Sequence, residues 1–401
     1  MPGLMTMMAL APSTLSVKRC FRSKETPGTT VLLLTKRSSS SSAHLLRRSW
    51  ARGAATATAT AIRDEQELMQ RLDEDGWVDR HLLPLLTPVE EAWQPADLLP
   101  SFAASADEQR SKVAELQARA AAVPDDLLVC LVGNMITEEA LPTYMSMGNR
   151  VAGASDATGC DGHAWARWLR GWTAEENRHG DLLNRYLYLC GRVDMRQVET
   201  TVHHLLRRGM RAIPRPSSPY HSLIYGAFQE RATFVSHART AGRASRHGDA
   251  CLAKICGVIA ADERRHEAAY TKASARAFET DPDGLVRALA AVMRAKVTMP
   301  GELMTDGRDE HLFDHFSAVA QRSGVYTAAD YGDMVEHFVR RWKVAELGAD
   351  LSGEGRRAQD YVCGLPRKIR RMEELAQDRA AKMEAQSVRF SWVFDRPVRT
   401  L

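Results

Sequence analysis

The chain has 401 residues, of which 44% are hydrophobic and 26% are charged, and its formal net charge is +4. This balance is typical of a globular protein and excludes a chain that is disordered throughout. Residues 1–63 hold ten Lys or Arg and a single acid, Glu25, so this segment carries +9 and the rest of the chain carries −5. The basic excess is confined to one end, which argues against a nucleic-acid-binding protein.

The N-terminal segment has the composition of an organelle transit peptide. It contains a run of serines at 38–42 and an alternation of Ala and Thr at 54–61, and it is basic and almost free of acids. These are the features of segments that direct import into mitochondria or plastids. We predict a transit peptide at 1–63, followed by a single domain at 64–401.

Two further classes of protein are excluded by the remaining sequence. No stretch of about 20 apolar residues is present, so we expect a soluble protein without a membrane span. The seven cysteines are scattered without a CxxC pair, which predicts neither a disulfide framework nor a zinc site.

From residue 64 onward the apolar residues recur with helical spacing, and Gly and Pro fall between long periodic segments. The spacing predicts helices at about 124–150, 161–189, 219–240 and 248–278. Further helices are expected at 283–300, 309–323, 327–347 and 354–385. Only residues 390–398 read as a strand, so we predict an all-α fold with a short C-terminal β segment.

Two of these helices carry a Glu and a His three residues apart. The pairs are Glu176 with His179, and Glu263 with His266. Residues at this spacing project from the same face of a helix. A single such pair is weak evidence for a metal site, because Glu and His at this spacing more often lie on a solvated helix face.

The other two long helices each bring a Glu into apolar company. Glu138 lies among Leu131, Met135 and Leu141, and Glu230 lies near Phe234. Burying an unpaired carboxylate is costly, so these side chains should reach water or bind a cation. Four helices that supply Glu, Glu-x-x-His, Glu and Glu-x-x-His provide the ligand set of ferritin-like di-metal bundles.

The mixed oxygen and nitrogen ligands favour redox-active iron over calcium or structural zinc. Spacing alone leaves open which member of each acidic doublet binds. Glu175 is four residues before His179, and Glu139 adjoins Glu138.

Several longer sequence segments resemble those of a known protein family. They include ITEEALPTY at 136–144, WTAEENRHGDLL at 172–183, FQERATF at 228–234, AADERRH at 260–266 and FDHFSAVAQR at 313–322. With these strings, residues 64–401 closely resemble the plant-type stearoyl-acyl carrier protein desaturases. The resemblance implies a soluble enzyme that introduces a cis double bond into an acyl chain held on acyl carrier protein, with carbon 9 of the stearoyl chain as the expected position.

The resemblance implies two iron ions per subunit, bound by Glu138, Glu176, His179, Glu230, Glu263 and His266. It also implies a homodimer, electrons from reduced ferredoxin, dioxygen as the oxidant, and a location in the plastid stroma. It assigns Trp93 and Asp262 to the electron route and places Thr233 beside the active site. From the residues alone, a packed Trp, a carboxylate that orients a His and a helix Thr that bonds its own backbone are equally good interpretations.

The chain departs from the family pattern at three positions. It has Asn134, Met145 and Gly148 where members commonly have Asp, Gln and Leu. All three fall on the predicted helix of Glu138, which in the family borders the acyl tunnel, so they bear on chain length and double-bond position. The alternative function is a ferritin-like iron-binding or storage protein without an organic substrate.

Overall fold

The computed structural model describes residues 65–101, 105–211, 213–296, 298–348 and 351–401. The predicted transit peptide lies outside the described residues. Within them, no single helix is long and apolar enough to cross a membrane, and one bent pair of helices, Ala106–Ala120 with 125–148, meets the length and composition criteria together.

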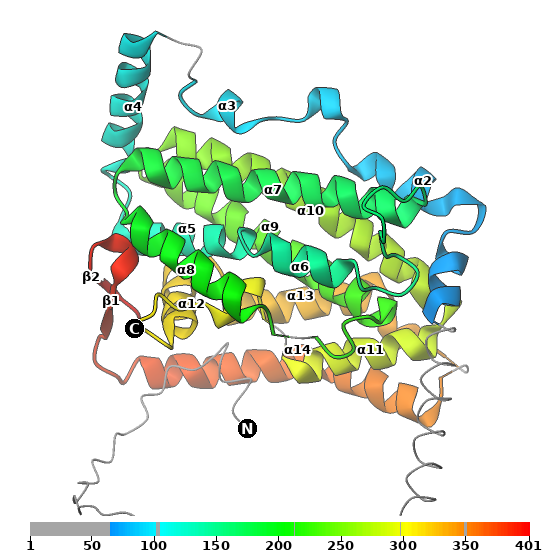
Figure 1. The fold of residues 1–401 in the computed structure, drawn as a ribbon. Coiled ribbons are helices and arrows are strands. Elements are labelled where there is room, and N and C mark those ends of the chain that lie inside the picture. The colour runs from blue at the N-terminus through cyan, green and yellow to red at the C-terminus, as the bar shows by residue number, and fades with distance from the viewer. Residues whose placement is uncertain (1–64, 102–104, 212, 297, 349–350) are drawn as a thin grey trace, which may run out of the picture. The chain divides into compact units, whose positions relative to one another are not determined.

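The described part is built almost entirely of helices, which confirms the predicted all-α class (Figure 1). The helices are α2 (Trp77–His81), α3 (Pro95–Leu98), α4 (Ala106–Ala120), α5 (Asp125–Glu138), α6 (Leu141–Gly148), α7 (Ala164–Cys190), α8 (Met195–Arg208), α9 (Pro219–Arg246), α10 (Ala250–Thr280), α11 (Pro282–Ala295), α12 (Leu312–Ser323), α13 (Ala328–Arg341) and α14 (Gly353–Ala380).

Helices α5, α7, α9 and α10 form the central bundle. Helix α9 packs against α10 along much of its length, and α5 contacts both α7 and α9. Every residue from Leu127 to Glu138 in α5 is buried, as expected for a helix that is apolar all round and enclosed by others. Helix α12 covers a further face of α5, while α11 and α13 pack against α9 and α14 packs on both α11 and α13.

The helix ends are fixed by side chains that satisfy the free backbone groups. The buried carboxylate of Asp249 accepts a hydrogen bond from the Leu252 amide at the start of α10, and it also accepts the hydroxyl of Tyr186 from α7. Gly191 ends α7 in the left-handed conformation, with φ of 66°, which glycine adopts without steric cost. These contacts set the register of α7 against α10.

The predicted helix at 124–150 is wrong as a single element. Helix α5 ends at Glu138, and α6 begins at Leu141 with Pro142 in its first turn. Proline has no backbone N–H and its ring obstructs the preceding turn, so it is favoured at a helix start over a helix interior. The break leaves Glu138 in the last turn of α5, directly before the change in chain direction.

Helices α4 and α8 were not among the predicted elements, and the C-terminal strand proves to be a hairpin. Strands β1 (Ser387–Phe390) and β2 (Arg396–Arg399) pair antiparallel, with Val388 opposite Val398. A 3-10 turn at Ser391–Val393 separates them and carries the buried Trp392, whose indole N–H donates to Thr201 of α8 at 2.9 Å. The hairpin is thereby anchored on α8.

Candidate metal centre

Six acidic and imidazole side chains meet inside the central bundle. Glu138 comes from α5, Glu176 and His179 from α7, Glu230 from α9, and Glu263 and His266 from α10. All six are at most 5% exposed, and both histidines are completely buried. These are the six residues that the sequence predicts as metal ligands.

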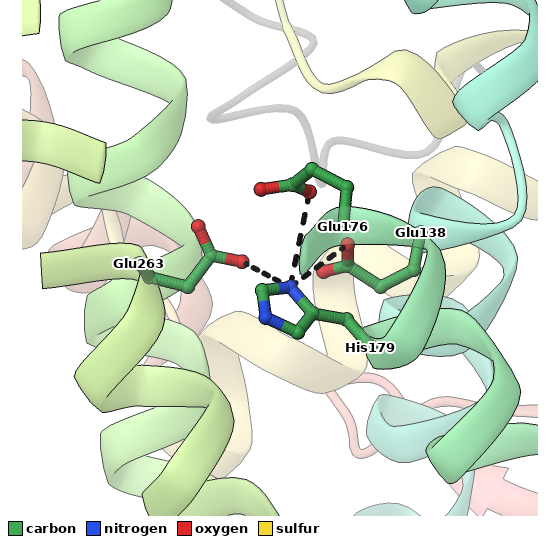
Figure 2. Close-up of side chains that lie close together, drawn as sticks. All are labelled: Glu138, Glu176, His179 and Glu263. Carbon is green, nitrogen blue, oxygen red and sulfur yellow. Dashed lines mark ion pairs between the residues drawn. The ribbon is translucent and has the colours of Figure 1, made fainter. Parts of the chain in front are cut away.

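One half of the cluster surrounds His179 (Figure 2). Its Nδ1 lies 3.3 Å from Glu263 Oε1, 3.8 Å from Glu176 Oε2 and 4.0 Å from Glu138 Oε2. One atom from each of these four residues falls within 4.8 Å of the others, so this group could hold a metal ion.

The other half surrounds His266 in the same manner. Its Nδ1 lies 2.8 Å from Glu176 Oε1, 3.5 Å from Glu230 Oε2 and 4.0 Å from Glu263 Oε2. This second group meets the same distance criterion. Glu176 and Glu263 each turn one oxygen toward each histidine, so both carboxylates belong to both halves of the cluster.

The polar atoms of the cluster lack ordinary partners. Both Nδ1 atoms and both oxygens of Glu263 are buried without a hydrogen bond. Burial, with repulsion from neighbouring carboxylates, raises the pKa of Glu138 and Glu230. Two divalent cations would satisfy the unpaired atoms and neutralise the four carboxylates, so the residues present fit a two-metal site.

The far nitrogen of each histidine is held by a carboxylate from the opposite helix. His179 Nε2 of α7 lies 3.3 Å from Asp262 Oδ2 of α10, and His266 Nε2 of α10 lies 2.8 Å from Glu175 Oε2 of α7. Each orienting carboxylate immediately precedes the inward-facing Glu of its own helix. Such contacts fix the ring orientation of a metal-binding histidine and leave its Nδ1 free for the metal.

Arg265 links the two outer carboxylates. Its guanidinium donates to Asp262 Oδ1 at 2.8 Å and to Glu175 Oε2 at 3.3 Å, and it also donates to the Leu85 carbonyl. Burial opposes ionisation of Asp262, but the hydrogen bond and charge of His179, together with Arg265, lower its pKa to about 2. Asp262 therefore remains a charged acceptor.

The structure places the members of each acidic doublet in different environments. Glu138 and Glu176 face the cluster, whereas Glu175 lies behind His266. The Glu139 carboxylate lies against Gly180 of α7, where an added Cβ would be 3.3 Å from Glu139 Oε1.

Trp93 lies outside the cluster on the His179 side. Its indole N–H donates to Asp262 Oδ2 at 3.1 Å, and its ring stacks over His179 with centroids 6.2 Å apart and planes 10° from parallel. The Arg178 guanidinium covers the Trp93 ring at 5.2 Å. The half-buried Trp93, Asp262 and His179 thus form a continuous contact chain that ends in the cluster.

A largely apolar cavity adjoins the four carboxylates. It has an empty volume of about 1000 Å³, part of which is open to solvent, and Glu138, Glu176, Glu230 and Glu263 form one part of its wall. The remaining wall is mostly aromatic and aliphatic and includes Tyr144, Trp165, Trp168, Leu169, Trp172, Leu223 and Tyr270. Thr233 also lines the cavity, while its hydroxyl donates to the carbonyls of Gln229 and Glu230.

The three departures from the family pattern do not share this cavity. Of the three, only Gly148 belongs to its wall. Asn134 lines a smaller cavity between α5, α9, α12 and α13, and Met145 lies on α6, where its sulfur is 3.8 Å from the Asn149 amide nitrogen. The expectation that all three border one tunnel on one helix is wrong, because the break before α6 redirects the chain.

Three supporting residues were not predicted as part of the site. Glu175 was considered as a ligand and instead orients His266. Arg265 joins the two outer carboxylates, and His237 Nε2 lies within hydrogen-bond distance of Glu138 Oε1, at 3.0 Å. The acidic residue before each Glu-x-x-His was the available signal for Glu175. For His237, its position seven residues after Glu230, on the same face of the helix, was the available signal.

Comparison with known proteins identifies the family. Residues 64–394 match the model of a fatty acid desaturase family. The sequence is 68% identical to acyl-[acyl-carrier-protein] desaturase 4, chloroplastic, of Oryza sativa subsp. japonica, over 87% of this chain and 86% of that protein. This chain belongs to the fatty acid desaturase family.

Other relatives of the desaturase carry more specific names. It is 59% identical to the stearoyl-[acyl-carrier-protein] 9-desaturase, chloroplastic, of Ricinus communis, over 81% of each chain. It is 55% identical to stearoyl-[acyl-carrier-protein] 9-desaturase 3, chloroplastic, of Arabidopsis thaliana, over 85% of this chain and 84% of that one. The crystal structure of DesA2 from Mycobacterium tuberculosis aligns with a TM-score of 0.44 at 19% identity, covering 74% of this chain and 98% of that chain. Membership of the desaturase family favours an oxidoreductase over the iron-storage alternative.

Proposed function

We propose that this desaturase introduces a cis double bond at carbon 9 of a saturated 18-carbon acyl chain carried on acyl carrier protein. The observation that carries the proposal is the apolar cavity whose wall includes all four carboxylates of the cluster. An acyl chain in this cavity would lie beside the metal centre, whereas an iron-storage protein has no need of such a space. The relatives with 9-desaturase names support the substrate class.

Iron is the metal proposed for the cluster. The six ligands supply oxygen and nitrogen donors in a proportion typical of redox-active di-iron sites. When bound, the iron pair would provide the oxidising power needed to remove hydrogen from an unactivated methylene, which amino-acid side chains cannot do. In the balanced reaction, two vicinal hydrogens leave the chain, and dioxygen becomes two water molecules using these hydrogens, two electrons and two protons.

The chain's own residues would orient the substrate and keep water away from it. Trp172 and Tyr144 lie side by side on the cavity wall, with ring centroids 5.6 Å apart. The Tyr144 hydroxyl also donates to Glu176 Oε2 at 3.3 Å, so the apolar wall is continuous with the cluster. Burial raises the pKa of Tyr144 well above its ordinary value, which keeps this hydroxyl protonated as a donor.

Electrons would enter through Trp93. The indole N–H of this half-buried residue donates a hydrogen bond to Asp262, which in turn contacts His179 of the cluster. Reduced ferredoxin is the proposed donor, and Thr233 is proposed to contact the reacting part of the acyl chain from the cavity wall.

The proposed assembly is a homodimer that works in the plastid stroma. The acid-poor, basic segment at 1–63 supports import, and the relatives are named as chloroplastic. A fluorescent reporter fused to residues 1–63 should enter plastids. A reporter that stays in the cytosol would contradict the targeting proposal.

Mass spectrometry of reaction products tests the activity. Protein lacking residues 1–63 would be loaded anaerobically with ferrous iron and incubated with reduced ferredoxin, dioxygen and either 16- or 18-carbon acyl carrier protein. We expect a mono-unsaturated 18-carbon product with its double bond at carbon 9. Oxygen consumption that does not depend on the acyl substrate would instead favour an iron-handling protein.

A further inference from the structure

The two halves of the metal centre differ in how their outer carboxylates are held. Glu138 belongs to the His179 half and Glu230 to the His266 half. The two carboxylates occupy corresponding places, yet among the described residues only Glu138 has a hydrogen-bond partner outside the cluster, which is His237.

His237 is buried in the bundle and directed at Glu138. It is 1% exposed, and its Nε2 lies 3.0 Å from Glu138 Oε1. When Glu138 is ionised, as a metal ligand would be, its oxygen accepts and the imidazole donates from Nε2. The opposite nitrogen, Nδ1, is buried without a hydrogen-bond partner. The Glu138 carboxylate is therefore the one polar group that this side chain serves among the residues the structure describes.

Ser236, the residue before His237, makes a second contact between α9 and α5. Ser236 of α9 donates to Asn134 Oδ1 of α5 at 3.1 Å. Asn134 lies one helical turn before Glu138 on the same face of α5. Two adjacent residues of α9 thus bond to one stripe of α5, which holds the imidazole at a fixed distance from the Glu138 carboxylate.

Glu230 has no comparable support. In the described part of the chain, the only polar side-chain partner of its carboxylate is His266 of the cluster itself, at 3.5 Å. Glu230 also lines the apolar cavity, so its side chain has neighbouring space in which to change orientation. Glu138 reaches the same cavity, but its Oε1 is already bound to His237.

We propose that His237 is a positioning residue that fixes the Glu138 carboxylate and makes the two metal positions inequivalent. The position between Glu138 and His179 has a rigid set of ligands, and the position between Glu230 and His266 has an adaptable one. This role rests on the proposed iron centre, but it concerns the difference between the two positions and not the presence of metal.

Anaerobic titration of the metal-free protein with ferrous iron tests this role. Calorimetry measures the affinity of each position, and Mössbauer spectra of the loaded protein report the environment of each iron. For the wild type we expect about two irons per chain, with unequal affinities and two distinct spectra. Loss of an outer-shell partner commonly weakens metal binding by about 10-fold to 100-fold, so His237→Leu should weaken one position by this factor and change one spectrum.

Two further variants separate positioning from folding. His237→Gln retains an N–H donor and should restore part of the lost affinity. His221→Leu is the matched control: His221 lies on the same helix, is 7% exposed and also has an unpartnered Nδ1, but it is outside the cluster. The control should leave both affinities and both spectra unchanged, and the melting temperature of each metal-free variant checks its fold.

The outcomes distinguish this inference from the proposed function. A folded His237→Leu protein with wild-type affinities and spectra would overturn the role of His237 and leave the iron centre intact. A wild type with two equal positions would also overturn it. A wild type that binds no iron would refute the metal centre itself, and this role with it.

Discussion

At the scale of single residues, Glu230 is the ligand whose loss should have the simplest effect. It serves only the His266 half of the cluster, whereas Glu176 and Glu263 serve both halves. We expect Glu230→Ala to lower the iron content from about two to about one per chain and to abolish turnover, because one position loses a charged ligand.

Metal analysis and product formation measure these two effects. Glu139→Ala is the matched control, since Glu139 adjoins Glu138 in sequence but lies against Gly180, outside the cluster. Full iron content in Glu230→Ala would remove Glu230 from the ligand set.

Gly148 is the departure from the family pattern that should affect substrate choice. It lines the apolar cavity, and a Cβ at this position would lie 3.0 Å from Leu169 Cδ1. A leucine would have to displace Leu169 or enter the cavity. We expect Gly148→Leu to change the ratio of 18- to 16-carbon rates by about tenfold or less, since a few methylene contacts decide it.

Competitive turnover on the two acyl carriers gives this ratio directly. Gly257→Leu is a suitable control, because a Cβ on this exposed residue would meet nothing within 4 Å. An unchanged ratio in Gly148→Leu would show that position 148 does not contact the acyl chain, and a wild type faster on the 16-carbon carrier would refute the proposed preference.

The sequence, with its family resemblance, predicted the six residues that meet in the cluster and named Asp262 and Trp93 beside them, but not the supporting roles of Glu175, Arg265 and His237. Glu-x-x-His occurs twice, and both members of each pair share a helix face, so local spacing indicated a metal site. The choice within each acidic doublet came from the family resemblance. Contacts such as His237 with Glu138, or Glu175 with His266, join residues about 90 or more positions apart. They depend on how the helices pack, which residue spacing within one helix does not specify.

At the scale of helices, Gly133 allows α12 to pack closely on α5. A Cβ at this position would lie 2.1 Å from Phe316 Cε2. We expect Gly133→Ala to lower the free energy of unfolding by about 1–3 kcal/mol, the usual effect of overpacking a core. The higher helix propensity of Ala, worth up to about 1 kcal/mol, offsets part of this loss.

Thermal or denaturant unfolding measures the change, and a double variant identifies its cause. Gly133→Ala with Phe316→Leu should recover part of the stability, because the smaller side chain relieves the clash. Gly257→Ala, at an open helical position, should be neutral or slightly stabilising. A Gly133→Ala protein as stable as the wild type would mean that Phe316 rotates away freely.

Helix type was easier to predict than helix ends. The long apolar periodicity correctly predicted α7, α9 and α10, and their observed ends differ from the predicted ends by up to six residues. The break at Glu139–Ala140 was missed although Pro142 signalled it, because the apolar pattern continues through the turn. Helix α8 was missed although Asp194 caps its start, with its side chain accepting from the Gln197 amide.

At the scale of the whole molecule, metal should stabilise the protein more strongly at higher pH. Burial raises the pKa of Glu138 and Glu230 above the ordinary 4.5. Burial opposes protonation of His179 and His266, but carboxylate hydrogen bonds outweigh it and raise both pKa values above 6.5. The metal-free folded state therefore holds extra protons, and the stability they confer is lost as the pH rises through these raised values.

Melting temperatures of metal-free and iron-loaded protein, compared under anaerobic conditions, check this prediction. We expect the gain on iron binding to be larger at about pH 8 than at about pH 5.5, because protons compete with the metal for the same atoms. Replacing Glu138 and Glu230 together by Gln should flatten the pH dependence of the metal-free protein. An equal gain at both pH values would contradict this account.

The crossed support of the two histidines has a consequence for the alignment of α7 with α10. Glu175 of α7 holds His266 of α10, and Asp262 of α10 holds His179 of α7. If one helix slid along the other by a single residue, about 1.5 Å, both carboxylate–histidine pairs would be strained. Both contacts therefore depend on the same alignment of α7 and α10. Both imidazoles are aimed at the cluster by contacts between side chains of α7 and α10, so a substitution that breaks either contact should disturb both halves of the cluster.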